Sequence, residues 1–136
     1  MPLQLSSLNS GSNGNCYYIG NDEDAVLVDA GISCRETERR MHRLGLDLKK
    51  IRAILISHEH TDHTRGVEVL SRKHRIPVFI TDATCRKGRL RIEAGLKRHF
   101  TTGQILEIGS LKVEPFAKWH DAVEPHSFTV SGGGYT

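Results

Sequence analysis

The stretch AILISHEHTDH at residues 53–63 constrains the fold more than any other, because an apolar run passes directly into a polar cluster. A short apolar run bounded in this way is typical of a buried strand with both faces covered. Three histidines and an aspartate follow it closely: His58, His60, Asp62 and His63. The sequence therefore predicts a buried strand that ends where these four side chains meet.

The chemistry of this cluster indicates a metal centre. Imidazole nitrogens and carboxylate oxygens are common protein ligands of zinc and neighbouring divalent ions. In an extended chain His58 and His60 point to the same side, and a following turn brings Asp62 and His63 to a second position nearby. A single histidine is more often a hydrogen-bonded surface or core residue, but this clustering favours metal binding at two adjacent positions.

Strand and helix patterns alternate around the cluster, which predicts an α/β fold. We expect strands at residues 3–8, 16–19, 25–28, 51–57 and 76–81. We expect helices over residues 34–44 and 64–74, and a basic helix from a cap at Asp82 or Thr84 to about Gly95. The first helix has capping-box spacing between Ser33 and Glu36, with Cys34, Thr37, Met41 and Leu44 on its inward face.

The last part of the chain changes to strand patterns. QILEIGSLKVEPFAKWH reads as two strands around a Gly-Ser turn, and HSFTV as another strand. The final SGGGYT contains a hairpin turn with no returning strand, so we expect the sequence to be cut short. No repeat, linker or low-complexity segment divides it, and residues 1–136 are expected to form a single, incomplete domain.

Cysteine usage and the absence of targeting signals bear on location. Cys16, Cys34 and Cys85 are far apart and form no C-x-x-C pair, so they are expected to be free thiols rather than disulfides or a zinc site. No signal peptide or apolar run long enough to span a bilayer is present. We therefore expect a soluble, cytoplasmic protein with no membrane partner.

Basic residues concentrate in two segments, although the net charge is only +3. One segment contains Arg86, Lys87, Arg89, Arg91, Lys97 and Arg98, and the other contains Arg35, Arg39, Arg40 and Arg43. Such segments can hold phosphate groups, or they can form solvated helix faces that keep the protein soluble.

The histidine cluster also resembles a known family signature. H-x-H-x-D-H at residues 58–63, after an apolar strand, resembles that of the metallo-β-lactamase superfamily of binuclear metal hydrolases. VLVDAG (26–31) resembles the family's strand ending in aspartate, and WHDAVEP (119–125) the segment that carries its next metal-binding histidine. Together with GSNGN at 11–15, the pattern is most similar to the YycJ/WalJ-type branch of cytoplasmic, nuclease-related proteins.

The resemblance implies a fold and a set of ligands. The fold is the N-terminal half of a four-layer αββα sandwich, with a mixed sheet of about six to eight strands covered on one face by two or three helices. The implied ligands are His58, His60 and His120 for the first ion, and Asp62 with His63 for the second. The ions would be zinc, with manganese as an alternative, and Asp29 would orient the histidine loop by hydrogen bonding.

The resemblance also implies a metal-dependent hydrolase that uses a metal-bound hydroxide, with Asp62 as the catalytic carboxylate. A phosphodiesterase or nuclease acting on nucleic acid agrees best with the basic sequence, whose pI is about 8.9. A hydrolase of small thioesters, lactones or lactams on the same centre is the alternative.

An inactive metal-binding fragment also stays open, because the family's remaining ligands would come from beyond the end of the sequence. Exposed sheet edges would then favour self-association. The other histidines match no motif position and are expected to be ordinary: His42, His74, His99 and His126. The GSNGN loop is explained by its hairpin, although its N–H groups could also line the substrate entrance.

Overall fold

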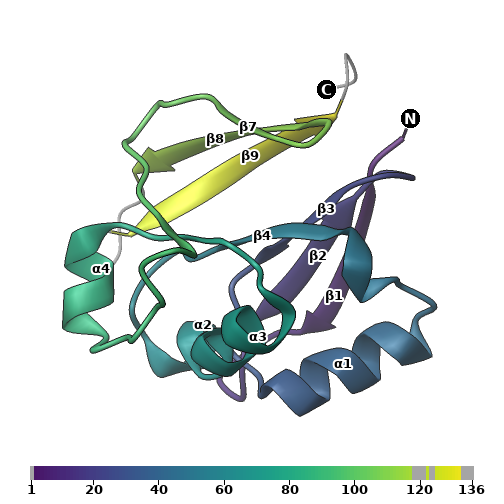
Figure 1. Cartoon of the computed structure of the whole chain (residues 1–136), viewed down its shortest axis with the longest axis horizontal. Coiled ribbons are helices and arrows are strands. Elements are labelled where there is room, and N and C mark those ends of the chain that lie inside the picture. Colours follow the sequence, from purple (N-terminus) through teal and green to yellow (C-terminus); the bar gives the residue numbers. More distant parts are fainter. Residues whose placement is uncertain (1, 118–121, 123–124, 133–136) are drawn as a thin grey trace.

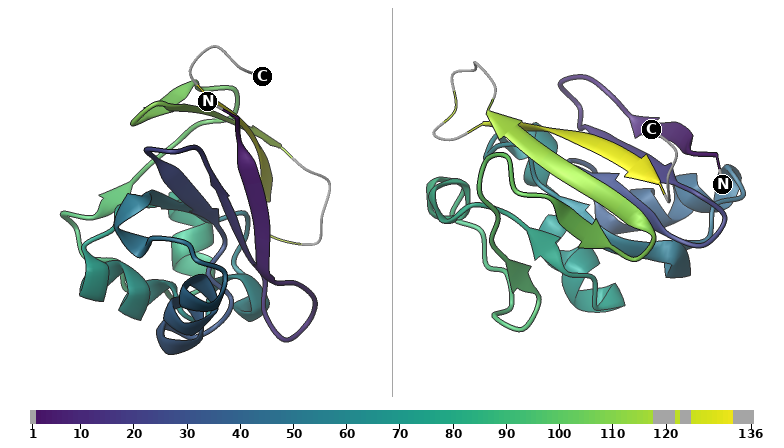
Figure 2. Two further views of the ribbon diagram at one scale, coloured as in Figure 1. Left: turned by 90° about the vertical axis from the view of Figure 1, so that its right-hand side faces the viewer. Right: turned by 90° about the horizontal axis from the view of Figure 1, so that it is seen from above.

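The protein consists of two β-sheets that face each other, with helices on the outer face of the larger sheet (Figures 1 and 2). A computed structural model describes residues 2–117, 122 and 125–132. The larger sheet has six strands in sequence order: β1 (Gln4–Asn9), β2 (Cys16–Gly20), β3 (Ala25–Val28), β4 (Ile51–Leu55), β5 (Val78–Phe79) and β6 (Lys97–Arg98). The smaller sheet is formed by β7 (Leu106–Ile108), β8 (Leu111–Ala117) and β9 (His126–Gly132).

The larger sheet is mixed. β1, β2 and β3 pair antiparallel, whereas β3, β4, β5 and β6 pair parallel. Parallel neighbours need long crossovers, and these are supplied by α1 (Cys34–Arg43), a short 3₁₀ helix (Leu48–Lys50), α2 (Thr61–Thr64), α3 (Val67–His74) and α4 (Asp82–Lys87). The carboxyl ends of β3, β4 and β5 therefore meet at one edge of the sheet.

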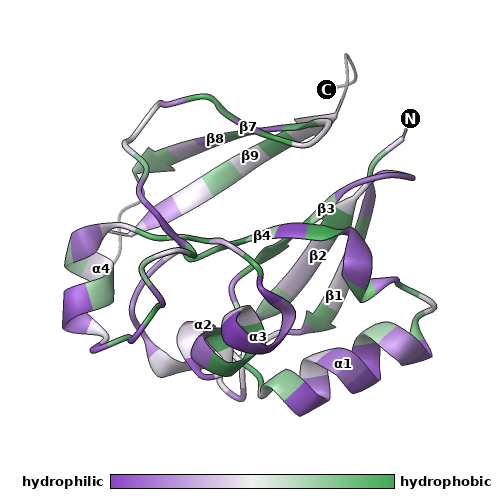
Figure 3. Ribbon diagram, in the orientation of Figure 1, coloured by the Kyte–Doolittle hydropathy of each residue, from purple (hydrophilic) through white to green (hydrophobic). Residues whose placement is uncertain are grey.

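Two hydrophobic clusters hold these layers together. One lies between the larger sheet and the helices and includes Leu27, Ile54, Met41 and Leu70. The other lies between the sheets, where Val26, Ala53 and Leu55 share a cluster with Leu106, Ile108, Leu111 and Val113. β3 and β4 contribute side chains to both clusters. Figure 3 shows hydrophobic stretches on these two strands, whereas α1 is largely hydrophilic. The continuous apolar runs of these strands follow from burial on both faces.

The expected α/β fold is confirmed. The larger sheet is mixed and has six strands, within the expected six to eight, and the described strands β7–β9 form a separate antiparallel sheet. Two facing sheets are the arrangement that the expected αββα sandwich requires. Within the described residues, no helix has the length and apolar character required to cross a lipid bilayer.

Helix α1 begins as its sequence predicts. Ser33 lies at the N-cap, and its Oγ accepts a hydrogen bond from the Glu36 backbone N–H at 3.1 Å. The expected inward position of Leu44 is wrong: this side chain is 49% exposed, because the helix ends at Arg43 and Leu44 is its C-cap. Gly45 then adopts a positive φ of 71°, as expected for a residue that ends a helix.

The second expected helix, over residues 64–74, is found as α3, which begins later, at Val67, and a short additional helix, α2, precedes it. A tertiary contact at Gly66 separates these two helices. The Gly66 N–H donates to the Ala30 carbonyl at 2.8 Å, while the Asp62 carbonyl, its partner in a continuous helix, accepts from Asn15 N–H at 2.6 Å. A Cβ at Gly66 would lie 1.9 Å from the Ile32 carbonyl oxygen, so only glycine fits this close approach.

The basic helix α4 is shorter than expected. It ends at Lys87 instead of continuing to about Gly95, and its N-cap is Thr81, whose Oγ1 accepts from Thr84 N–H at 3.2 Å. Arg89 then adopts a positive φ of 53°, which turns the chain out of the helix. The segment has to turn here because β6 must return to pair with β5.

Candidate metal centre

The predicted site lies where β3 and β4 end side by side. The Asp29 N–H, directly after β3, donates to the carbonyl of Leu55, the last residue of β4, at 2.8 Å. Asp29 has a positive φ of 67°, so the chain turns sharply at this point. The loop from Ser57 to His60 follows β4, and α2 begins at Thr61. This is the edge of an open α/β sheet at which ligands commonly bind.

Three of the four clustered residues are histidines whose rings lie together. The ring centroids of His58 and His60 are 4.6 Å apart, and those of His58 and His63 are 3.9 Å apart. His58 is buried, whereas His60 and His63 are half-buried. The structure therefore gathers imidazoles at the boundary between core and solvent.

The Asp29 carboxylate holds this loop, as the sequence analysis expected. Its Oδ1 accepts from the Ser57 backbone N–H and its Oδ2 from the Ser57 hydroxyl, both at 2.8 Å. The same Oδ2 lies 2.6 Å from Nδ1 of His63. Because a carboxylate only accepts hydrogen bonds, this contact places the proton on Nδ1 and leaves Nε2 of His63 as the nitrogen with a lone pair.

Asn15 is a site residue that the sequence analysis missed. Its Nδ2 lies 3.3 Å from Oδ2 of Asp62 and 3.2 Å from Nε2 of His63, and its backbone N–H donates to the Asp62 carbonyl. The GSNGN loop was assigned a hairpin role, which is confirmed by the pairing of β1 with β2. Gly31, in the segment after β3, also approaches Asp62 closely, since a Cβ at this position would lie 1.8 Å from the Asp62 carbonyl oxygen.

The buried thiol of Cys16 lies at the same end of the sheet. Burial raises its pKa to about 12, and the nearby Asp29 carboxylate adds to this rise. A thiol with this pKa stays protonated near neutral pH, so it is a poor nucleophile. The expectation that Cys16 is a free thiol is confirmed.

His126, which the sequence analysis treated as ordinary, connects the smaller sheet to the site. Its backbone N–H donates to the carbonyl of Ser57 at 2.9 Å, and its Nε2 lies 2.9 Å from Oγ1 of Thr102. The ring also packs edge-on against Phe100. The first residue of β9 thus lies beside the start of the histidine loop, which no local signal in the sequence could indicate.

The structure brings together four of the five predicted ligands: His58, His60, Asp62 and His63. Oδ2 of Asp62 lies 3.7 Å from Nε2 of His63. His120 lies outside the described residues, so its approach to His58 and His60 stays a prediction.

Comparison with known proteins identifies the family. A family model described as the metallo-beta-lactamase superfamily matches residues 10–134, which is nearly the whole chain. The chain belongs to this superfamily. Exodeoxyribonuclease YycJ of Bacillus anthracis is 39% identical over 128 residues, a match that covers 92% of this chain and 48% of that protein. Exodeoxyribonuclease WalJ of Streptococcus pneumoniae serotype 2 (strain D39) is 33% identical over 131 residues, covering 93% of this chain and 49% of that protein.

Both relatives are longer proteins, and the chain spans about half the length of the curated relatives it matches. Among solved structures, it is similar to MEM-A1, a subclass B3 metallo-beta-lactamase from a soil metagenome library, with a TM-score of 0.73 and 21% identity. That match covers 93% of this chain and 54% of the other. At this identity the similarity shows the fold alone.

The donor set fits the divalent ions that this superfamily uses. Imidazole nitrogens and a carboxylate are gathered at one sheet edge, and Asp29 orients one imidazole through its Nδ1. A histidine ligand that donates its other N–H to a carboxylate is the usual arrangement around a protein-bound metal.

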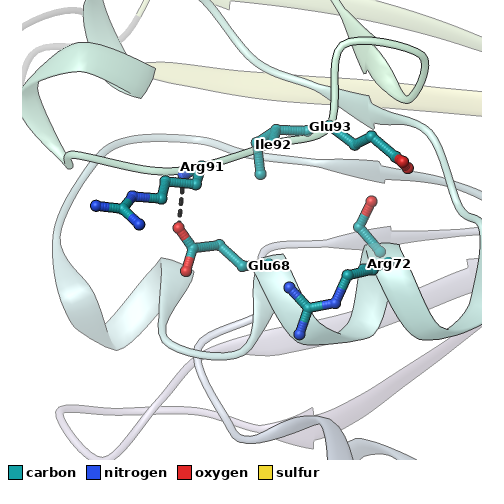
Figure 4. Close-up of a pocket in the computed structure, with 6 residues that line it drawn as sticks. Glu68, Arg72, Arg91, Ile92 and Glu93 are labelled. Atoms are coloured by element: carbon teal, nitrogen blue, oxygen red, sulfur yellow. Dashed lines mark hydrogen bonds between the residues drawn. The ribbon is translucent and has the colours of Figure 1, made fainter.

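A separate surface pocket lies between α3 and the segment after α4 (Figure 4). Its lining includes Glu68, Arg72, Arg91 and Glu93, and it contains none of the predicted metal ligands. Figure 4 shows Glu68 directed at the Arg91 backbone, whose N–H donates to Oε2 at 2.5 Å. Both acidic and basic side chains line the pocket. The hydrogen bond between Glu68 and the Arg91 backbone attaches the segment after α4 to α3. We therefore assign this pocket a structural role.

Proposed function

We propose that this chain contributes the histidine and aspartate ligands of a metal-dependent hydrolase that cleaves phosphodiester bonds in nucleic acid. The observation that carries the proposal is the gathering of His58, His60, Asp62 and His63 at the end of β4 in a chain of the metallo-beta-lactamase superfamily. The names of the two exodeoxyribonuclease relatives support nucleic acid as the substrate.

Each residue has a role in this proposal. His58, His60 and His120 hold one divalent ion, and Asp62 and His63 hold part of a second site. Bound ions would polarise the scissile phosphate and lower the pKa of a water molecule. Asp62 accepts a hydrogen bond from the attacking water, while Asp29 and Asn15 keep His63 and Asp62 in position. We propose zinc as the ion, with manganese as the alternative, because imidazole and carboxylate ligands suit both.

The basic end of α4 supports a polyanionic substrate. Arg86, Lys87 and Arg89 are exposed around Gly88, where a Cβ would lie 3.3 Å from Cβ of Glu59 in the histidine loop. The backbone that carries these basic residues therefore packs against the histidine loop. A phosphodiester backbone needs such positive charge near the scissile bond, whereas a neutral lactam or lactone does not.

The proposal is tested by incubating the purified chain with end-labelled single- and double-stranded DNA and RNA in the presence of Zn²⁺ or Mn²⁺. We expect metal-dependent cleavage that His58→Ala abolishes and Asp62→Asn lowers about 100-fold or more. His42→Ala is the matched control, because His42 is exposed on α1 and should leave the rate unchanged. Hydrolysis of a thioester or lactone without nucleic acid cleavage, or no turnover of any substrate, would contradict the proposal.

We also propose a cytoplasmic location and self-association. All three cysteines are free and buried, which suits a reducing compartment. β1 lies at one edge of the larger sheet, and β9 is the last strand of the described smaller sheet. Such edges can pair with another chain.

A further inference from the structure

Three side chains of the types that ligate metals lie together between α1 and α3. Neither helix contributes a ligand to the histidine centre proposed above. Cys34 is the first residue of α1, Glu38 lies one turn later on the same face, and His74 is the last residue of α3. One donor atom of each lies within 4.8 Å of the donor atoms of the other two. The packing of two helices thus assembles a sulfur, an oxygen and a nitrogen at one point.

The Glu38 carboxylate of this cluster is already paired with a cation, the Lys73 ammonium. Glu38 Oε2 accepts a hydrogen bond from the Lys73 ammonium at 2.8 Å and lies 2.7 Å from Nε2 of His74. Cys34 is only 6% exposed, whereas Glu38 and His74 are half-buried and open to solvent. The Lys73 side chain is 57% exposed, so it can swing into solvent when an ion takes its place beside Glu38.

We propose that Cys34, Glu38 and His74 form a binding site for a zinc-like divalent ion. Thiolate, imidazole and carboxylate are the ligand types of zinc, and three protein ligands leave a fourth position for water. On binding, the Cys34 thiol releases its proton to solvent, His74 coordinates as a neutral imidazole, and Glu38 exchanges Lys73 for the metal. The bound ion joins the start of α1 to the end of α3.

Cobalt(II) is the probe that separates this site from the histidine centre. A thiolate bound to Co²⁺ gives a charge-transfer absorption in the near ultraviolet, and the proposed ligands of the histidine centre include no sulfur. We expect this band when the intact chain is titrated with Co²⁺, and its loss in Cys34→Ser and in His74→Ala. Cys85→Ser is the matched control, because Cys85 is equally buried, at 6% exposure, and should keep the band.

Two further variants make the test independent of folding defects. Lys73→Ala removes the competing ammonium and should tighten cobalt binding. A folding defect could weaken cobalt binding, but it would not produce this increase in affinity. His58→Ala should leave the band unchanged, which separates this site from failure of the proposed hydrolase centre. Absence of the band in the intact chain, its persistence in Cys34→Ser, or its loss in Cys85→Ser would overturn the proposal.

Discussion

At the scale of single residues, Asp29 organises the site. Its two oxygens accept hydrogen bonds from the Ser57 N–H, the Ser57 hydroxyl and Nδ1 of His63. The positive φ at Asp29 turns the carboxylate away from the path of β3 and into the histidine loop. Replacing a buried carboxylate that accepts three hydrogen bonds lowers the free energy of unfolding, because each acceptor that is lost leaves a buried donor without a partner.

Replacing Asp29 with asparagine tests this role. Asparagine tolerates the positive φ, but its amide nitrogen replaces one acceptor and faces a donor. We expect a loss of about 1–3 kcal/mol in the free energy of unfolding and a metal affinity lowered about 10- to 100-fold. Urea denaturation and metal titration measure these two quantities.

Asp24→Asn is the matched control for this experiment. Asp24 also accepts several hydrogen bonds, but from Ser110 and Arg52, away from the histidines. It should lower stability while leaving metal affinity unchanged. An Asp29→Asn variant with unaltered metal affinity would show that the carboxylate supports only the fold.

At the scale of secondary-structure elements, the turn between β7 and β8 is attached to the larger sheet. Asp24, directly before β3, accepts from the backbone N–H and hydroxyl of Ser110 at 2.8 and 2.7 Å, and from Arg52 Nε at 2.6 Å. The hydrogen bond from Arg52 is the main reason why the pKa of Asp24 lies below its usual value, and Ser110 adds to it. One carboxylate thus links the two sheets.

The lowered pKa of Asp24 predicts an acid-dependent contribution to stability. A depressed folded-state pKa stabilises the protein above the unfolded value of about 4, and this contribution disappears as the pH falls through the folded pKa. The stability difference between the native chain and Asp24→Asn should therefore be largest near neutral pH and shrink below about pH 4. Urea denaturation across this range measures it, with exposed Asp22→Asn as the control. A difference independent of pH would contradict the assignment.

We expect basic residues of helix α4 to contribute to nucleic-acid binding, and this prediction rests on the proposed function. Replacing both Arg86 and Lys87 with alanine should weaken DNA binding and reduce the slope of log affinity against log salt by about one unit per lost phosphate contact. Binding is measured by fluorescence anisotropy without added metal. Arg35→Ala with Arg43→Ala on α1 is the matched control, and an equal effect of both pairs would indicate nonspecific attraction.

At the scale of the whole molecule, the interface between the two sheets defines the fold. The hydrophobic cluster between the sheets contains residues from β3, β4, β7 and β8, and His126 extends the contact to the end of β4. This shared core supports our proposal that residues 1–136 belong to a single domain. The exposed Leu5 on β1 and Phe116 on β8 lie on the strands of the sheets, outside this core.

Self-association is the prediction at this scale. Leu5 is 71% exposed on β1, the edge strand of the larger sheet, which can pair with a second copy. We expect concentration-dependent association in sedimentation velocity, and its weakening by Leu5→Lys. Val69→Lys is the control, because Val69 is exposed on α3 instead of on a strand. A monodisperse monomer at all concentrations would contradict the prediction.

Features that depend on neighbouring residues could be predicted from the amino-acid sequence. The apolar run before the histidines predicted β4, the Ser33 spacing predicted the start of α1, and the Gly-Ser turn predicted the pairing of β7 with β8. The alternation of strands and helices predicted the fold class. These signals are local because strand periodicity, helix caps and tight turns involve contacts over only a few residues.

Contacts between segments that are far apart in the chain could be seen in the folded protein alone. The tertiary structure placed Asn15 beside Asp62, separated α2 from α3 at Gly66, and brought His74 to Cys34. It also separated β7–β9 from the larger sheet. Each of these outcomes depends on how separate segments share one buried core, and the free energy of that packing is set by the whole chain and not by any local pattern.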